Sequence, residues 1–470
     1  MRAATLVVAC LLLAAVTLLA PSSPSYDPFA WIVWGRQLMT GEPFGLAGGP
    51  SWKPLPVLFT APFSLAGDAA APQLWLLVAR AGLLLALAGA YALGARLAGR
   101  AAGAAALVAL VLLADVVSLA WRGASEPLLL AAILWAIERH LAGARRVAFG
   151  LGVAAALIRP EALPFVGLYA AFCWRDATPR ERGLLAGGLV LAVLLWIGVP
   201  ALAGDPLAAS TTARNPATRT SAWSALRGDL GIALAGVWLL ALAAVVLRPR
   251  ERAMQALALG AAAWLALLTA MAAAGYAGVP RYALPAAACA CVLAGVGLVA
   301  LAERARASAA WVALALLLAV VLALPGAGRL GDLDDQLRAG LAVAHAHTDL
   351  RAAVADAGGP APLRRCALRG WLAVNHTAQS ALAWELRAPL DRVARFLRHP
   401  GLLVHAERSA ATGAPAATAL PRPLRVAERA RAGRWRVLAV HPAGVPLPRA
   451  CGPAGRPREA SGAPRRIPNI

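Results

Sequence analysis

The sequence predicts an all-α polytopic membrane bundle of about eleven transmembrane segments, followed by a small α/β domain outside the cytoplasm. The residues are 60% hydrophobic and only 14% charged, whereas soluble domains carry about 25% charged residues. Apolar runs of roughly 20 residues recur as far as residue 325 and then stop. The net charge of +22 would suggest nucleic acid in a soluble chain. Here much of it lies between apolar runs, so we expect no nucleic-acid partner.

The first apolar run covers residues 4–20 and follows Arg2. A short charged start, an apolar stretch and then Pro-Ser-Ser also fit a cleaved signal peptide. We interpret the run as a retained helix, because the sidedness of the later segments is then consistent.

Ten further apolar runs follow the opening loop, and the charges between them predict the side on which each loop lies. The runs cover residues 74–95, 101–119, 126–142, 147–158, 162–174, 183–203, 229–247, 253–274, 285–302 and 309–325. One set of breaks, together with Arg2, holds 14 cations, whereas the alternate set holds eight over longer loops. The positive-inside rule places the first set in the cytoplasm. We therefore predict a multi-pass protein of the cell membrane with its N-terminus inside and its last 145 residues outside.

Two of these runs, 147–158 and 162–174, are too short to span a membrane alone, since a spanning helix needs about 20 residues. Arg159-Pro160-Glu161 separates them. We interpret them as two short helices that meet at a polar break on the external side. A single kinked helix is the alternative, but it would reverse the sidedness of everything downstream, against the charge pattern.

The composition changes after Pro325. Residues 332–357 have helical spacing and end at Gly358-Gly359-Pro360, and shorter apolar stretches follow, as in a small α/β domain. We thus predict a transmembrane domain over 1–325, with its first external loop at 21–73, an α/β domain over 326–445 and a disordered tail over 446–470.

The region after residue 325 is strongly basic, with 22 Arg against 10 Asp and Glu. Outside the cell it would favour anionic head groups or wall polymers, although a solvated Arg-rich surface explains it equally well. Cys366 and Cys451 could pair there, because oxidising compartments permit disulfides. The sequence alone does not decide the bridge.

The predicted external edge gathers ionisable residues that suit a charged ligand. The opening loop holds Asp27 and Lys53, which is the only lysine in the chain and is either functional or a chance survivor. Arg80 and Asp115 lie inside apolar runs, where charge is costly and usually marks a site. The cations that predominate are Arg36, Lys53, Arg80, Arg122, Arg159 and Arg281. Arginine and lysine bind phosphate, so we expect a cavity for a phospholipid-like carrier.

Carboxylates rather than histidines are expected to supply a general base or hold a divalent metal. One histidine, His140, lies in a predicted cytoplasmic loop, and the other six follow residue 325. Phosphate-loop, dinucleotide-binding, nucleophile-elbow and HExxH motifs do not occur in the sequence. The predicted cytoplasmic loops are only a few residues long, so they could not form a nucleotide-hydrolysing domain.

Several short motifs, taken in order, resemble the GT-C superfamily of membrane glycosyltransferases, which includes protein O-mannosyltransferases and the aminoarabinose transferase of lipid A. The motifs are Tyr26-Asp27, Ser51-Trp52-Lys53-Pro54-Leu55, Ser125-Glu126, Arg159-Pro160-Glu161, Gly204-Asp205-Pro206-Leu207 and Gly278-Val279-Pro280-Arg281-Tyr282. The resemblance covers about residues 1–325. It implies an integral membrane enzyme that takes a sugar, for which mannose is one candidate, from a polyprenyl-phosphate carrier at the external face.

The resemblance also implies roles for individual residues. Asp27 would be the catalytic base that activates the hydroxyl of a glycan, lipid or protein acceptor, and Lys53 would bind the carrier phosphate. The remaining residues expected to line the substrate pocket are Arg36, Arg80, Arg122, Glu126, Arg159, Glu161, Arg281 and Tyr282. Many relatives have Asp-Glu where this chain has Asp27-Pro28, and Lys-Pro-Pro where it has Lys53-Pro54-Leu55. The requirement for a metal therefore stays open.

Two other functional classes are compatible with these motifs. A transporter or flippase of lipid-linked glycans would use the same phosphate-binding cavity, and a scaffold for cell-envelope assembly would act through the tail. A transporter should show a polar route to the cytoplasmic side, yet the inner halves of the apolar runs hold almost no ionisable residues. This favours the transferase, with a family member that has lost activity as the third interpretation.

Overall fold

The computed structural model describes residues 3–214, 219–306, 308–395, 397, 400–406, 408, 425–442, 445 and 447–451, and only the backbone over 309–325. Contacts divide the chain into two units. The helical unit comprises residues up to Leu19, Lys53–Leu55 and Leu76–Leu337. The sheet unit comprises Ala20–Trp52, Pro56–Trp75 and the described residues from Arg338 onward.

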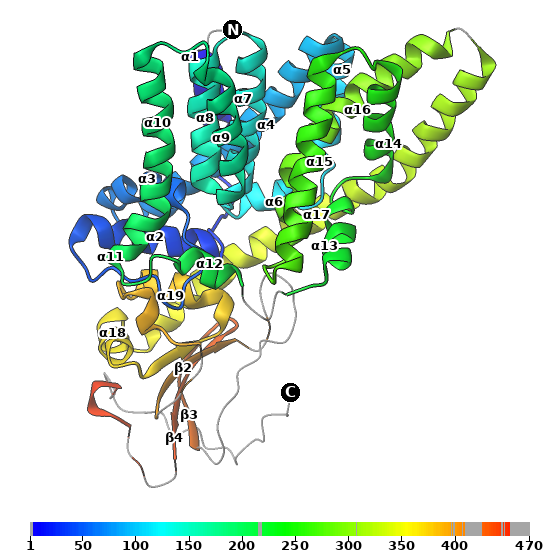
Figure 1. The fold of residues 1–470 in the computed structure, drawn as a ribbon. Helices are drawn as coiled ribbons and strands as arrows, with labels where there is room; N and C mark the ends of the chain where they lie inside the picture. The colour runs from blue at the N-terminus through cyan, green and yellow to red at the C-terminus, as the bar shows by residue number, and fades with distance from the viewer. Residues whose placement is uncertain are drawn as a thin grey trace. The chain divides into compact units, whose positions relative to one another are not determined.

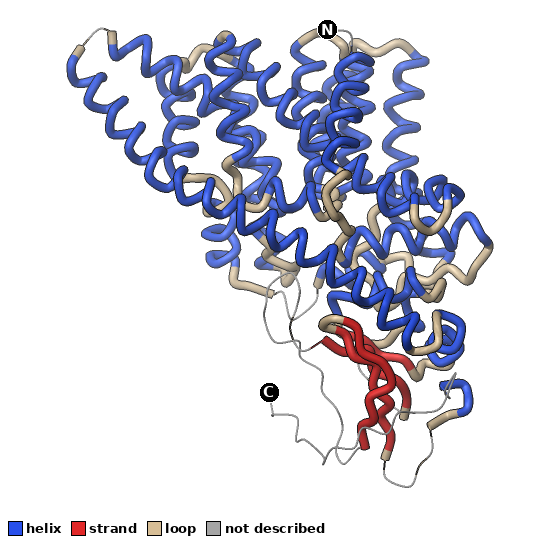
Figure 2. Tube along the Cα trace, turned by 180° about the vertical axis from the view of Figure 1, so that it is seen from behind, coloured by secondary structure: helices blue, strands red, loops and turns tan. Residues whose placement is uncertain are grey.

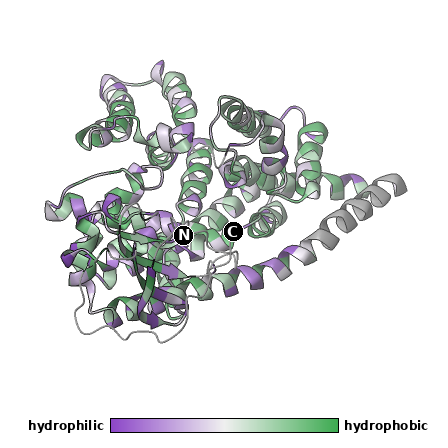
Figure 3. Cartoon of the chain, turned by 90° about the horizontal axis from the view of Figure 1, so that it is seen from below, coloured by the Kyte–Doolittle hydropathy of each residue, from purple (hydrophilic) through white to green (hydrophobic). Residues whose placement is uncertain are grey.

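The helical unit consists of helices, and most of them overlap the predicted apolar runs (Figure 1). In chain order the helices are α1 (Ala3–Thr17), α4 (Ala70–Ala98), α5 (Arg100–Val111), α6 (Val116–Trp121), α7 (Glu126–Leu141), α8 (Arg145–Ile158), α9 (Leu163–Trp174), α10 (Pro179–Val193), α11 (Val199–Leu202), α12 (Ala208–Ala213), α13 (Ala222–Leu230), α14 (Ala235–Leu247), α15 (Arg252–Ala273), α16 (Leu284–Ala305) and α17 (Ala309–Asp356). The first residues of α4 and the end of α17 belong to the sheet unit. Figure 3 shows hydrophobic residues, in green, along most of these helices.

The predicted count of about eleven spans is not confirmed. Among the described residues, four helices are long and apolar enough to cross a membrane, or five if one bent pair forms a single span. The four are Ala70–Ala98, Pro179–Leu202, Arg252–Ala273 and Pro280–Ala305. Other predicted runs form helices of 12 to 16 residues, such as α7, α8 and α9, which is shorter than the roughly 20 residues that a straight span needs.

Two predicted continuous runs are broken in the structure. The run 101–119 divides into α5 and α6 at Asp115, whose φ of 59° lies in the left-handed region that Asp tolerates. The run 229–247 bends by 84° between α13 and α14. The two breaks contact each other, because the Ala114 N–H donates to the Ile232 carbonyl at 2.8 Å. Broken backbone is tolerated at membrane depth where protein groups satisfy it in this way.

Helix α16 lies at the centre of the helical unit, and most of its residues are buried. It packs against α5, α14 and α15. A Cβ atom on Gly295 would meet the Ala102 carbonyl of α5, and one on Gly297 would meet the Leu240 carbonyl of α14. Small residues are typical of helix contacts in membranes because they let two backbones approach closely.

The predicted pair of short helices is confirmed as α8 and α9, separated by a 3-10 turn over Pro160–Ala162. Pro160 has no N–H, so it cannot bond to the Ala156 carbonyl four residues earlier. The indole N–H of Trp196 donates to that carbonyl instead, at 2.8 Å. Trp196 lies in a π-helical turn, Leu194–Gly198, at the end of α10. The break is therefore satisfied by a side chain from another helix.

The sheet unit contains a four-stranded sheet, in agreement with the predicted C-terminal α/β fold (Figure 2). Its strands are β1 (Leu372–Val374), β2 (Gly401–Ala406), β3 (Arg425–Ala432) and β4 (Trp435–His441), in the spatial order β1-β2-β4-β3. Strand β1 is parallel to β2, and the other two pairs are antiparallel. Leu403 pairs with Leu438 in a small core that also contains Ala373 and Val440.

Besides the end of α17 and the first residues of α4, further helices in the described part of the chain belong to the same unit as the sheet. They are α2 (Tyr26–Thr40), most of α3 (Pro54–Phe63), α18 (Pro360–Leu368) and α19 (Gln379–Glu385). Helix α2 packs against α19, and Thr60 of α3 donates its hydroxyl to the Trp31 carbonyl of α2 at 2.8 Å. The opening loop thus groups with the C-terminal residues. The proposed domain boundary at residue 325 falls within the continuous helix α17, which ends before Gly358-Gly359-Pro360 as predicted.

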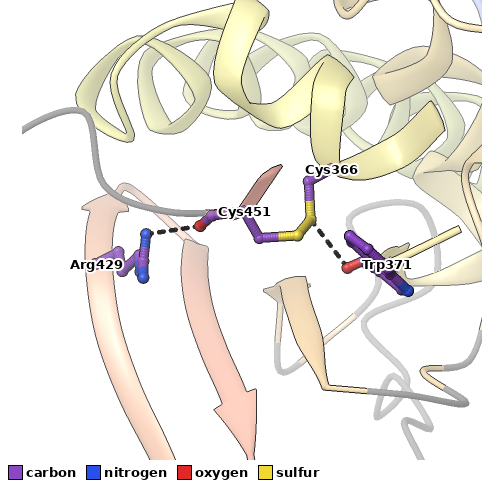
Figure 4. Close-up of a disulfide and its surroundings, with 4 residues drawn as sticks. All are labelled: Cys366, Trp371, Arg429 and Cys451. Carbon is purple, nitrogen blue, oxygen red and sulfur yellow. Dashed lines mark hydrogen bonds between the residues drawn. A yellow bond between two sulfur atoms is a disulfide. The ribbon is translucent and has the colours of Figure 1, made fainter. Parts of the chain in front are cut away.

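Cys366 and Cys451, the two cysteines that the sequence left undecided, form a disulfide (Figure 4). The bridge joins α18 to the 3-10 turn Arg449–Cys451. Arg429 of β3 donates to the Cys451 carbonyl at 3.0 Å, which holds the bridged turn against the sheet. Within the predicted disordered tail, this turn is ordered, whereas residues 452–470 lie outside the described residues.

Candidate functional site

A cluster of charged side chains surrounds Glu126 in the helical unit. Glu126 begins α7 and is only 1% exposed. Its Oε1 atom lies 3.2 Å from Arg159 Nη2, 3.6 Å from Lys53 Nζ and 3.6 Å from Arg281 Nε. Residues that are far apart in sequence thus bring three cations to one buried carboxylate oxygen.

Lys53 is held by the Ser125-Glu126 motif. Its ammonium donates to Ser125 Oγ at 2.8 Å, and the residue is 8% exposed. Ser125 itself is fully buried at the N-cap of α7. The single lysine of the chain is therefore a buried cation bonded to a second sequence motif, rather than a solvated surface residue.

Arg159 connects the two carboxylates of the cluster. Its backbone is extended, with φ −138° and ψ 121°, so the side chain leaves the end of α8 towards Glu126 and Glu161. Arg159 Nη1 donates to Glu161 Oε1 at 3.2 Å. The guanidinium also lies 3.6 Å from the centre of the Tyr282 ring. Stacking of this kind is characteristic of arginine and unavailable to lysine in the same planar form.

The turn that carries Arg281 and Tyr282 is fixed by a tryptophan. The indole N–H of Trp264, on α15, donates to the Tyr282 carbonyl at 2.9 Å. The turn is a 3-10 segment, Pro280–Ala283, that leads into α16. Sequence reasoning did not identify Trp264 or Trp196, because nothing local distinguishes them from the other apolar residues of their helices.

Two further predicted cations of the helical unit have other surroundings. Arg80 donates to the Thr17 carbonyl at 2.8 Å and stacks on Trp121, 4.0 Å from the ring centre. Arg122 follows the last residue of α6 and donates to the Ser118 carbonyl at 3.4 Å, and it lies close enough to Asp115 and Arg281 to interact with both charges. The structure thus brings six predicted residues together: Lys53, Glu126, Arg159, Glu161, Arg281 and Tyr282.

Asp27 and Arg36 lie on α2, in the sheet unit. Arg36 is buried between Glu42, at 3.4 Å, and Trp384, whose carbonyl it bonds at 3.3 Å. Burial lowers the pKa of Arg36, against the charges of Glu42 and Asp68. Asp27 lies half-buried in the first turn of the helix.

A histidine neighbours Asp27 in this unit, although sequence reasoning excluded histidine from the site. The ring of His376 lies 4.6 Å from that of Tyr26, in an edge-on contact. Burial and the charge of Arg395 lower the pKa of His376, whereas the nearby charge of Asp27 raises it. Burial raises the pKa of Tyr26 to about 12, so its hydroxyl stays protonated. His376 is 349 positions beyond Asp27 in sequence, so only the tertiary structure could place it there.

In the described part of the chain, no group of three or more His, Cys, Asp or Glu side chains converges as a set of metal ligands would. The carboxylates Glu126 and Glu161 are instead bonded by cations. The donor set of the cluster therefore suits an anion rather than a metal ion.

Solved structures provide the comparison for this fold. No family model and no curated protein matches the sequence. ArnT from Cupriavidus metallidurans in the apo state matches with a TM-score of 0.54 and 18% identity over 93% of this chain and 97% of that one. ArnT bound to undecaprenyl phosphate matches equally, over 96% and 99%.

The Archaeoglobus fulgidus oligosaccharyltransferase tethered to an acceptor peptide covers 68% of this chain and 54% of its own, at 16% identity. The TM-score of this match is 0.39. The match to ArnT, an aminoarabinose transferase, extends over nearly the whole length of both chains, including the C-terminal region that the sequence motifs left unexplained. The match to ArnT therefore shows that this chain and ArnT share a fold over nearly their whole length.

Proposed function

We propose that this protein is a membrane glycosyltransferase that moves a sugar from a polyprenyl-phosphate carrier to an acceptor hydroxyl. The observation that carries this proposal is the convergence of Lys53, Arg159 and Arg281 on Glu126. Three cations and the two carboxylates Glu126 and Glu161 leave one positive charge in the cluster. A sugar-phosphate diester carries one negative charge, so its binding would balance the charges. The fold shared with ArnT, which has been crystallised with undecaprenyl phosphate, supports a lipid carrier as ligand.

In the proposed reaction the acceptor oxygen attacks the anomeric carbon of the sugar. The bond between that carbon and the phosphate oxygen breaks, and polyprenyl phosphate leaves with the electron pair. Lys53, Arg159 and Arg281 would stabilise the charge that develops on the phosphate. Asp27 would take the proton of the acceptor hydroxyl, a role that rests on the resemblance to GT-C enzymes alone.

The buried face of α7 favours a transferase over a transporter. Glu126 lies at one end of this helix, and Glu138 lies near the other, bonded to Arg96 and Arg139. Between the two glutamates, the fully buried side chains of the helix are Leu129, Leu130 and Leu134. A transporter would need polar side chains between the two ends, whereas the fully buried side chains of α7 between the two glutamates are apolar.

The disulfide supports the proposed orientation, with the C-terminal region outside the cytoplasm. Structural disulfides persist in oxidising compartments and are rare in the cytosol. The charge distribution of the loops leads to the same orientation. A panel of donors and acceptors would identify the sugar and the acceptor, which is a glycan, a lipid or a protein.

The proposal is tested with the full chain reconstituted in lipid vesicles. Lys53→Ala should weaken the binding of undecaprenyl phosphate at least about tenfold, because it removes a buried charged hydrogen-bond donor. Asp27→Asn should lower transfer by about 10²–10⁴-fold, the usual effect of removing a positioned base. Asp332→Asn, an exposed change on α17, is the matched control and should behave as wild type. Unchanged carrier binding by Lys53→Ala would contradict the phosphate site. Near-normal turnover by Asp27→Asn would show that Asp27 is not the catalytic base.

A further inference from the structure

Glu161 has one carboxylate oxygen that the charged cluster does not use. Its Oε1 atom accepts from Arg159 Nη1 at 3.2 Å, and the residue is 8% exposed. Its Oε2 atom is buried and has no hydrogen-bond partner among the described residues. The Nε atom of Arg159 is buried and unpartnered in the same part of the chain.

A buried carboxylate oxygen without a partner is unusual and costly. More than about nine in ten buried polar groups in proteins are hydrogen-bonded, and a charged group left without a bond costs more free energy than a neutral one. Glu161 is also held firmly, because it follows Pro160, and Trp196 bonds the carbonyl that this proline leaves open. The oxygen is therefore presented in a fixed position rather than free to turn towards solvent.

The chemistry of this oxygen excludes phosphate as its direct partner. A carboxylate accepts hydrogen bonds and repels an anion, whereas the cations around Glu126 suit the phosphate. A bound sugar-phosphate diester would already balance the charge of the cluster, so the partner of Glu161 is expected to be a neutral hydrogen-bond donor. On a carrier-linked sugar, the neutral donors nearest to the phosphate are the hydroxyl groups of the sugar ring.

We propose that Glu161 Oε2 accepts a hydrogen bond from a hydroxyl of the sugar on the polyprenyl-phosphate carrier. Glu161 is then a specificity-determining residue that distinguishes the sugar-linked carrier from the sugar-free carrier released by the reaction. This inference rests on the proposed function of the same site. It assigns the phosphate to the cations at Glu126 and the sugar to Glu161.

The test compares two ligands on the purified full chain in detergent. The first is undecaprenyl phosphate, and the second is whichever of undecaprenyl-phosphate mannose, glucose and aminoarabinose the wild type binds most tightly. In Glu161→Gln, one oxygen can still accept from Arg159, and the other becomes a donor. We expect this variant to bind undecaprenyl phosphate within twofold of wild type and the sugar-linked carrier about tenfold more weakly. Glu138→Gln, which changes another buried glutamate of the helical unit, should alter neither affinity.

Each other outcome overturns the inference or the function on which it rests. Equal weakening of both ligands by Glu161→Gln would mean that Glu161 acts on the phosphate, and no weakening of either would mean that water satisfies the oxygen. A wild type that binds the sugar-linked carriers no better than the sugar-free one would also overturn the sugar contact. A wild type that binds neither lipid would contradict the proposed function itself. If thermal unfolding shows that Glu161→Gln does not fold, Glu161→Asp withdraws the carboxylate by one carbon and should give the same selective loss.

Discussion

Arg159 is the residue on which the charged cluster depends most. Its guanidinium bonds Glu126 and Glu161 with separate nitrogen atoms and stacks on Tyr282. These three contacts use the planar, forked geometry of arginine. A lysine would keep the charge but could meet only part of this arrangement.

Arg159→Lys is therefore expected to lower the rate of sugar transfer at least about tenfold, since a charge-assisted bond is worth about 1.5–3 kcal/mol. Tyr282→Phe keeps the ring under the guanidinium and should stay within about twofold of wild type. Initial rates in reconstituted vesicles, at saturating and limiting donor, would measure both effects. A wild-type rate for Arg159→Lys would show that charge alone is sufficient at this position.

At this scale the sequence already named the six residues of the cluster. It could do so because Lys53 is the only lysine, because the charged residues lie in short polar breaks between apolar runs, and because the motifs that contain them resemble those of a known family. It named Arg36 from the opening loop and Arg80 because its charge lies inside an apolar run, yet these residues contact Trp384 and Trp121. Sidedness predicts the depth of a residue in the membrane but not the direction in which its side chain leaves the helix.

The elements of the helical unit are joined by hydrogen bonds at their breaks. The Ala156 carbonyl has no helical donor, because Pro160 lacks an N–H, and it accepts from the Trp196 indole instead. The break beside Asp115 and the break at Ile232 are joined by a backbone hydrogen bond. In lipid an unsatisfied backbone group costs several kcal/mol. These contacts therefore set where the helices can be interrupted.

Trp196→Phe removes the donor to Ala156 while keeping an aromatic ring. It should lower the free energy of unfolding by about 1–3 kcal/mol, the cost of an unsatisfied buried acceptor, and reduce carrier binding through the displaced Arg159. Thermal unfolding in detergent and carrier titration would measure the two effects. Trp223→Phe, at a residue that is 66% exposed, is the matched control.

A second change tests the reason for the effect of Trp196→Phe. Pro160→Ala supplies an N–H four residues after Ala156 and lets the extended backbone at Arg159 return to helical angles, so it should recover part of the stability when combined with Trp196→Phe. Equal losses in the single and double variants would show that the new N–H does not replace the indole as the donor to Ala156.

A helix break was predicted where a proline and charged residues occur together. Arg159-Pro160-Glu161 contains both, and the break is present there. The bend between α13 and α14, at residues 231–234, contains neither, so the sequence predicted one continuous span over 229–247. Hydropathy records composition along the chain, whereas this bend depends on a hydrogen bond from another broken helix.

For the whole chain, the disulfide closes a long loop. Cys366 and Cys451 are 85 residues apart, and the segment between them includes all four strands of the sheet. A bridge over a loop of this length limits the unfolded chain and typically contributes about 2–5 kcal/mol. Its effect should fall on the sheet unit, to which both cysteines belong.

Replacing both cysteines by serine should therefore lower the midpoint of thermal unfolding, and reductant should lower that of the wild type to the same value. Differential scanning fluorimetry of the full chain, with and without reductant, would measure both. Reductant should have no effect on the double variant. An unchanged midpoint in both comparisons would contradict a stabilising role for the bridge.

The sequence by itself determined the helical character of the chain, the polar break at Arg159-Pro160-Glu161 and the presence of a C-terminal sheet. Each of these depends on neighbours within a few residues: apolar length, proline geometry and alternating strands. Only the tertiary structure decided that three cations converge on Glu126, that His376 contacts Tyr26, that Cys366 pairs with Cys451 and that the strands lie in the order β1-β2-β4-β3. These features join residues that are distant in sequence, so they depend on how whole elements pack and which buried groups need partners.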